Sequence, residues 1–127
     1  MSGKYLAFVI DDKSRELLLK AFPPLFSKVI CHHVTIKFND VHEDDVDQFL
    51  DVKEISVVGY ISDDYLEALV VKVHDTTKRG DGGTYHITLS LDPSKRKPFD
   101  SNKLLKSKEY VKVTPVIVTG KIKLENK

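Results

Sequence analysis

The stretch HVTIKF at residues 33–38 is echoed by HITLSL at residues 86–91. In both stretches apolar residues occupy every second position, which is typical of a strand with one buried face. The opposite face of each strand then carries an imidazole, followed two residues later by a hydroxyl group. We therefore predict two strands of the same design. Their motif residues are His33, Thr35, His86 and Thr88.

Outward from these stretches, alternating apolar segments predict further strands, and spacing of three to four residues predicts helices. A first helix should be capped by Asp12 or Ser14 and should end or bend at Pro23-Pro24. One helical turn is expected near Leu104-Leu105, and Pro115 should mark an edge or a bend. The expected strands cover residues 5–10, 30–38, 54–61, 66–73, 85–91 and 110–124, the last as one long strand or two shorter ones, with a short acidic helix over 40–50.

Strands and helices are mixed here without strict alternation, which favours an α+β fold with mainly antiparallel pairing. The chain has 127 residues, of which 41% are hydrophobic and 31% charged. This is the size of one ordinary domain with a real core, so residues 1–127 are predicted to form a single domain.

Composition also bears on location. No stretch approaches the roughly 20 apolar residues of a membrane helix, and the opening segment is too short for a secretory signal. Cys31 is the only cysteine, which excludes an internal disulfide. We expect an intracellular, cytoplasmic protein that makes no contact with a membrane.

The charges are segregated along the chain. Residues 11–67 hold 6 Lys/Arg against 13 Asp/Glu, whereas residues 68–127 hold 13 Lys/Arg against 6 Asp/Glu. A basic half favours a phosphate-bearing partner, and a solvated surface without a partner is an equal alternative.

The paired motifs resemble the signature of the 2H phosphoesterase superfamily, which includes RNA 2′,3′-cyclic phosphodiesterases and RNA-ligase-like proteins. That signature is two His-apolar-Thr/Ser-apolar motifs, matched here at residues 33–36 and 86–89. The resemblance covers most of residues 4–91. It implies a two-lobed fold of antiparallel sheets around a central cleft with outer helices, and one motif from each half. It also implies hydrolysis of a 2′,3′-cyclic phosphate on RNA or a nucleotide.

The chemistry follows from the residue types. Hydrolysis of a phosphodiester needs an activated water and a protonated leaving oxygen, and imidazole can serve either purpose near neutral pH. His33 and His86 are therefore predicted to be the acid–base pair, with the choice of base left open. Thr35 and Thr88 can bind the non-bridging phosphate oxygens. Lys37 and Ser90 follow on the same faces as possible substrate contacts.

A metal centre is the main rival interpretation of the histidines. His32 and His33 are adjacent, so a regular strand would point them to opposite faces, and no other ligand spacing suits zinc. We therefore expect no metal and no cofactor. His32 should share the face of Val34 and lie outside the site. His42 and His74 are expected on the surface.

Two segments and several functions remain open. The glycine-containing loop 78–83 is expected to be a hairpin connection that either covers a substrate or is a solvated turn, and residues 95–97 can attract a polyanion. The expected partners are an RNA terminus, a short oligonucleotide or a cyclic nucleotide, bound by a monomer. The alternatives are hydrolysis of 2′–5′-linked or cyclic oligonucleotides in signalling or antiviral defence, a non-catalytic RNA- or nucleotide-binding module, and a plain interaction domain.

Overall fold

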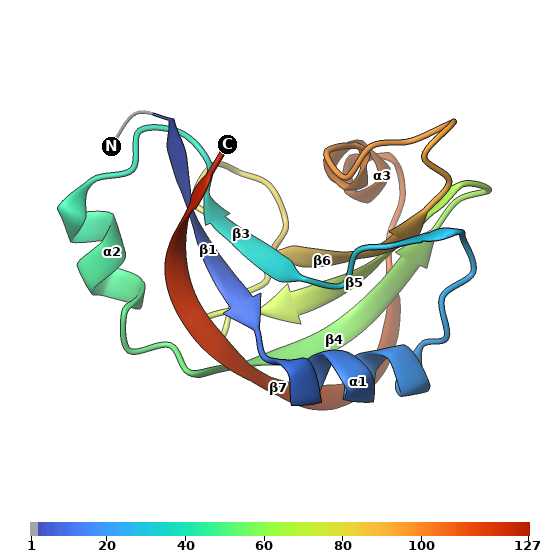
Figure 1. Cartoon of the computed structure of the whole chain (residues 1–127), viewed down its shortest axis with the longest axis horizontal. Helices are drawn as coiled ribbons and strands as arrows, with labels where there is room; N and C mark the ends of the chain where they lie inside the picture. Colours follow the sequence, from blue (N-terminus) through green and yellow to red (C-terminus); the bar gives the residue numbers. More distant parts are fainter. Residues whose placement is uncertain (1–2) are drawn as a thin grey trace.

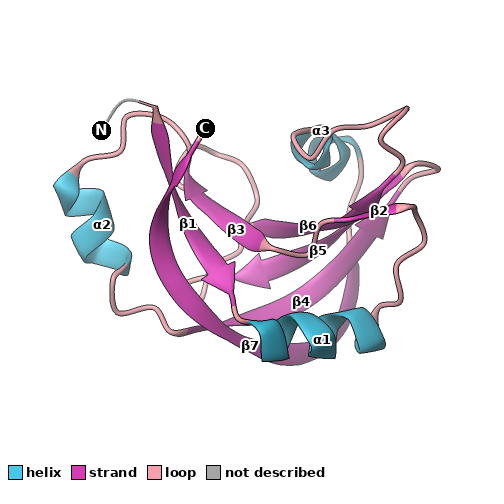
Figure 2. Ribbon diagram, viewed as in Figure 1, coloured by secondary structure: helices cyan, strands magenta, loops and turns pink. Residues whose placement is uncertain are grey.

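The computed structural model describes residues 3–127 and contains three helices and a seven-stranded sheet (Figures 1 and 2). Their bounds are β1 Lys4–Ile10, α1 Asp12–Ala21, β2 Lys28–Val29, β3 His33–Lys37, α2 Glu43–Phe49, β4 Glu54–Ser62, β5 Leu66–Lys72, β6 His86–Leu91, α3 Asp100–Ser107 and β7 Val111–Asn126. Helix α1 is capped by Asp11, whose carboxylate accepts a hydrogen bond from the Ser14 amide at 2.8 Å. The prediction of Asp12 or Ser14 as the cap is therefore wrong by one residue or more.

Six of the strands close into a barrel. Their order is β6-β3-β1-β7-β4-β5, every neighbouring pair is antiparallel, and β5 pairs back onto β6. The short β2 extends the pairing of β6 beyond β3. The α+β class and the antiparallel pairing are thus confirmed. The two-lobed arrangement is not confirmed, because strands from both halves of the chain share one barrel.

Strand β7 closes the barrel by serving two partners. Its first part pairs with β4 up to Thr119, and its second part pairs with β1 from Gly120 onward. A Cβ atom at Gly120 would lie 2.2 Å from the carbonyl oxygen of Val9, so only glycine allows this close approach. Pro115 lies where the β4–β7 register shifts, between the Val57 and Gly59 pairs, as expected for a residue without an amide donor.

The apolar faces of the two motif strands point into the barrel. Val34 and Ile36 of β3 and Ile87 and Leu89 of β6 are at most 3% exposed and belong to the main core cluster. Their alternation leaves the motif imidazoles and hydroxyls on the outer surface of the barrel. The predicted facing of both strands is confirmed.

Helix α3 covers part of that outer surface. Leu104 is buried with Ala68 of β5 and Leu91 of β6 in a second apolar cluster. Figure 1 shows α3 beside the ends of β4, β5 and β6, with α1 along the opposite side of the barrel. One helical turn was predicted here, and the structure extends it to eight residues. Within residues 3–127, no helix is long and apolar enough to cross a membrane.

The predicted strand over residues 30–38 is interrupted at Cys31. Its φ angle of 41° lies in the left-handed region, so the regular strand begins only at His33. The Cys31 amide donates to the carbonyl of Thr88 at 2.9 Å, and its carbonyl accepts from the Arg15 guanidinium at 3.1 Å. These contacts, together with complete burial of the side chain, hold a backbone conformation that cysteine otherwise avoids.

Candidate active site

The two motifs meet at a single backbone pairing. Val34 and Ile87, the middle residues of the motifs, are partners in the antiparallel bridge between β3 and β6. Because both point inward, the flanking residues of each motif point outward on the same side of the sheet. The four motif residues accordingly line one pocket of about 480 Å³, namely His33, Thr35, His86 and Thr88.

His86 lies deep in this pocket and is only 8% exposed. Its Nδ1 atom is 2.7 Å from the carbonyl oxygen of Thr84. Since a carbonyl can only accept, Nδ1 must carry the proton, and the neutral ring keeps an unprotonated Nε2. Burial lowers the pKa of His86, opposed by the Thr84 hydrogen bond, so the ring favours its neutral form. A neutral imidazole with a free Nε2 is suited to accept a proton.

His33 is partly buried against the ring of Tyr5, with 5.6 Å between the ring centroids. Burial, followed by the nearby imidazoles of His32 and His86, lowers the pKa of His33 to about 4. His86 lines the same pocket as His33. Both rings are therefore neutral at physiological pH.

His32 lies next to His33, contrary to the expectation that the two would face opposite sides. Their Nδ1 atoms are 3.1 Å apart, and the rings are edge to face with centroids separated by 5.3 Å. The reason is the backbone conformation of Cys31, which keeps His32 out of the regular strand. Two adjacent histidines in the sequence suggest such a contact. A regular strand would place them on opposite faces, so the contact was not predicted.

The two motif hydroxyls have different surroundings. Within residues 3–127, Thr35 makes no side-chain hydrogen bond that meets normal geometry, so its hydroxyl is available to a ligand. Thr88 Oγ1 is 2.8 Å from Ser101 Oγ of α3 and 3.4 Å from the Pro98 carbonyl. Ser101 is fully buried, so α3 holds the Thr88 hydroxyl in place at the pocket wall.

Arg79, which belongs to neither motif and was not predicted as a site residue, brings a permanent positive charge to the pocket. It belongs to the hairpin that precedes β6, which is closed by the Lys78–Thr84 bridge. Its guanidinium donates to Asp81 at 2.8 Å and to Asn102 at 2.9 Å, and the side chain is only 11% exposed. The available signal was an arginine in a glycine-containing loop shortly before the second motif.

Aromatic rings surround the motif residues. Tyr5 and Phe38 have ring centroids 5.6 Å apart, and Phe99 is 66% exposed at the start of α3. All three line the pocket. Lys127 also lines it, with its ammonium 4.7 Å from the centre of the Phe38 ring. The pocket thus combines cationic groups with exposed aromatic faces.

Lys37 and Ser90 lie outside the pocket that the motif residues line. Lys37 forms an ion pair of 2.9 Å with Asp45 of α2. Ser90 has no exposed surface, donates to Glu67 of β5 and accepts from the Phe26 amide at 3.3 Å. Neither side chain reaches the motif pocket, and Lys37 instead lines a neighbouring pocket. His42 and His74 are exposed, as predicted.

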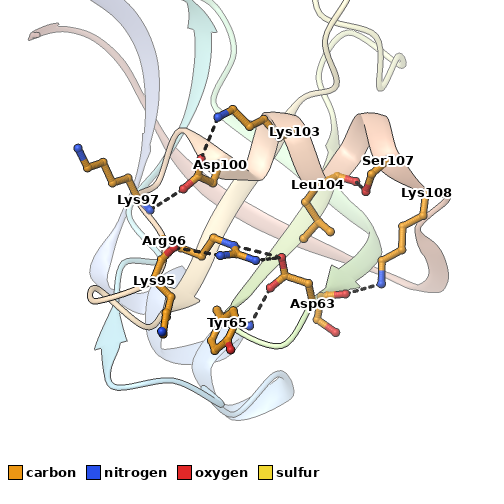
Figure 3. Close-up of polar contacts among 11 residues, drawn as sticks. Asp63, Tyr65, Lys95, Arg96, Lys97, Asp100, Lys103, Leu104, Ser107 and Lys108 are labelled. Atoms are coloured by element: carbon orange, nitrogen blue, oxygen red, sulfur yellow. Dashed lines mark hydrogen bonds and ion pairs between the residues drawn. The ribbon is translucent and has the colours of Figure 1, made fainter.

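The basic segment contains two kinds of cation (Figure 3). Arg96 is 3.2 Å from Asp63, and its guanidinium lies 4.9 Å from the centre of the Tyr65 ring. It therefore fastens the 92–99 segment to the barrel. Lys95 and Lys97 are exposed, and no salt bridge is formed by either among the described residues.

No protein-family model, curated protein or solved structure matches this chain. Across residues 3–127, no group of three or more His, Cys, Asp or Glu side chains is arranged to hold a metal ion. The titratable and hydroxyl groups that line the pocket include the two motif imidazoles, the two motif hydroxyls, the Arg79 guanidinium, the Asp81 carboxylate and the Lys127 ammonium.

Proposed function

We propose that this chain is a 2H-type phosphodiesterase that hydrolyses a 2′,3′-cyclic phosphate of RNA or a nucleotide. His33 and His86 act as general acid and base, Thr35 and Thr88 bind the phosphate oxygens, and no metal ion takes part. The proposal also includes the two-lobed fold implied by the resemblance, a cytoplasmic location and a monomeric state. One chain supplies all four motif residues to one pocket.

The observation that carries the proposal is the convergence of both motifs on one pocket. Two imidazoles on one surface can take a proton from water and give a proton to the leaving oxygen. Hydroxyl and guanidinium donors beside them can bind the negative charge that builds up on the phosphate oxygens. A plain interaction domain would not need these four residues in a shared cavity.

The rest of the pocket supports a nucleotide substrate. Lys127 and the guanidinium of Arg79, whose charge the ion pair with Asp81 partly offsets, favour an anion. The rings of Tyr5, Phe38 and Phe99 are suited to stacking on a base. A volume of about 480 Å³ is within the usual range for small-molecule sites. These features favour a nucleotide over a simple phosphate ester.

A second candidate reaction is hydrolysis of a 2′–5′-linked or cyclic oligonucleotide. It is favoured by a separate pocket of about 480 Å³ beside α2, which shares Phe38, Asn39 and Asp81 with the motif pocket. A substrate with a nucleoside on both sides of the reacting phosphate could occupy the two cavities together.

The test is hydrolysis of a panel of 2′,3′-cyclic nucleotides, 3′,5′-cyclic nucleotides, and 2′–5′ and 3′–5′ dinucleotides, with products separated by chromatography. The proposal expects turnover of 2′,3′-cyclic nucleotides, undiminished by EDTA. Turnover of the 2′–5′ dinucleotides instead would select the second candidate. Binding of these ligands without any product would identify a non-catalytic module and contradict both reactions.

A further inference from the structure

The two motif imidazoles differ in the partner of their Nδ1 atom. His86 faces the Thr84 carbonyl at 2.7 Å, whereas His33 faces the Nδ1 atom of His32 at 3.1 Å. A carbonyl has no proton to give. An imidazole nitrogen can either donate or accept. In neutral His86 the Nε2 atom must therefore be unprotonated, whereas in neutral His33 the Nε2 atom can be either protonated or unprotonated.

The Thr84 contact leaves His86 one neutral form, with Nδ1 protonated and Nε2 free to accept a proton. The contact between His32 and His33 needs one proton between the two Nδ1 atoms. If His33 donated that proton, its Nε2 would also be free, and the pocket would hold two bases and no acid. If His32 donates it, the Nε2 atom of His33 carries a proton, and the pocket holds one base and one acid.

We propose that His32 is a positioning residue that donates its Nδ1–H to His33, making His33 the general acid and His86 the general base. This inference rests on the proposed function. It also explains how a partly buried imidazole that resists charge can still deliver a proton. His32 is exposed to solvent, so a proton from solvent can reach the leaving oxygen through His32 and then His33.

The proton transfers balance. The oxygen of water forms a bond to phosphorus while its proton moves to Nε2 of His86, which becomes an imidazolium. The bond from phosphorus to the leaving oxygen breaks, and that oxygen takes the Nε2 proton of His33. The Nδ1 atom of His33 takes the Nδ1 proton of His32, and the exposed His32 takes a replacement proton from solvent at its Nε2 atom. His86 then returns to solvent the proton that it took from water, and exchange with solvent restores the starting state.

The test compares two phosphodiesters with different leaving groups. In a 2′,3′-cyclic nucleotide the leaving oxygen is a ribose alkoxide that needs a proton, whereas p-nitrophenolate leaves a p-nitrophenyl ester as a stable anion. His32→Asn retains an N–H donor toward His33 but has no proton to release. The matched control is His74→Asn, since His74 is also exposed and asparagine tolerates its φ of 49°.

We expect His32→Asn to lower kcat for the cyclic nucleotide by about 100-fold. Turnover of the p-nitrophenyl ester should fall less than about threefold, and His74→Asn should match the wild type on both substrates. Equal loss on both substrates, or no loss on either, would overturn the role of His32. A wild-type protein that hydrolyses neither ester would instead overturn the proposed function.

A spectroscopic measurement tests the proton positions without activity. Long-range ¹H–¹⁵N correlation spectra distinguish the two neutral forms of each imidazole. The proposal expects a protonated Nδ1 in His86 and a protonated Nε2 in His33, with the His33 form changing in His32→Ala. A protonated Nδ1 in wild-type His33 would contradict it.

Discussion

Val34 of β3 and Ile87 of β6 are antiparallel partners, so the centres of the two His-x-Thr motifs are direct neighbours in the barrel wall. An antiparallel pairing relates the two strands by an approximate twofold axis that passes between these residues. Each imidazole is thereby brought toward the hydroxyl of the opposite motif, on the surface away from the core. The duplicated sequence pattern thus becomes a pocket with two similar halves.

The two hydroxyls should respond differently to removal. Thr35→Val should lower turnover by roughly 10- to 1000-fold with little change in stability, because only the charge stabilisation is lost. Thr88→Val should lower turnover similarly and also reduce the free energy of unfolding by about 1–3 kcal/mol, because the buried Ser101 loses its partner. Kinetics and urea denaturation of both variants measure these effects. Equal destabilisation by the two substitutions would contradict the asymmetry.

Arg79 is expected to bind the phosphate. Arg79→Gln should lower kcat/KM by roughly 10- to 100-fold, because the pocket loses its guanidinium charge. Arg79→Lys should recover only part of this, since a single ammonium cannot contact Asp81 and Asn102 as the guanidinium does. Steady-state kinetics on the cyclic nucleotide measure both effects. Wild-type kinetics in Arg79→Gln would remove Arg79 from the site.

The exposed lysines beside α3 are expected to bind the remote part of an oligonucleotide. Replacing Lys95, Lys97 and Lys103 with serine should raise KM for oligonucleotides roughly 3- to 10-fold at low salt, because phosphate contacts are lost. Turnover of a mononucleotide 2′,3′-cyclic phosphate should stay the same. The matched control replaces Lys13 and Lys20 of α1, on the opposite side of the barrel (Figure 1).

Replacement of Arg96 should have a different effect from replacement of these lysines. It is engaged with Asp63 and Tyr65, so Arg96→Ser should lower stability rather than oligonucleotide affinity alone. If the lysine variant lost activity equally on the mononucleotide and on oligonucleotides, the basic segment would belong to the catalytic pocket.

Acid should destabilise the fold through the buried imidazoles. The pKa of His33 is lowered from 6.5 to about 4, and the pKa of His86 is also lowered. The unfolded chain therefore binds more protons than the folded protein between these pH values. The contribution of these neutral imidazoles to the free energy of unfolding is complete above about pH 6.5, and it is lost progressively as the pH falls toward 4. For His33 the loss is on the order of 3 kcal/mol.

The measurement is urea denaturation of the wild type and of His33→Gln at about pH 7.5 and pH 4.5. The variant should lose less stability on acidification, because one imidazole with a lowered pKa has been removed. An identical loss in wild type and His33→Gln would contradict a lowered pKa for His33.

The sequence predicts the fold where local patterns decide the structure. Period-two alternation located the strands around Val34 and Ile87 and the face that each one buries. Closure of the barrel was not predictable, because it depends on one long strand that pairs with both β4 and β1 and changes partner at Gly120. Such long-range pairing leaves little trace in a local pattern.

The candidate site was predictable in its repeated part only. Both His-x-Thr motifs could be read from the chain, and the structure brings them to one pocket. The contact between His32 and His33 depends on the left-handed conformation of Cys31, which is unusual for that residue type. Arg79 reaches the pocket through a hairpin whose course is set by tertiary contacts, including the hydrogen bond to Asn102.

The central claim is that His33 and His86 are an acid–base pair that hydrolyses a phosphodiester. The most direct measurement is turnover of a 2′,3′-cyclic nucleotide by the wild type, His33→Ala, His86→Ala and the control His74→Ala, after exhaustive EDTA treatment. We expect turnover by the wild type and the control to be independent of metal, and turnover by each motif variant to fall by at least about 100-fold. Circular dichroism should show that the motif variants retain the fold. A folded motif variant with near wild-type turnover, or a wild type that needs added metal, would contradict it.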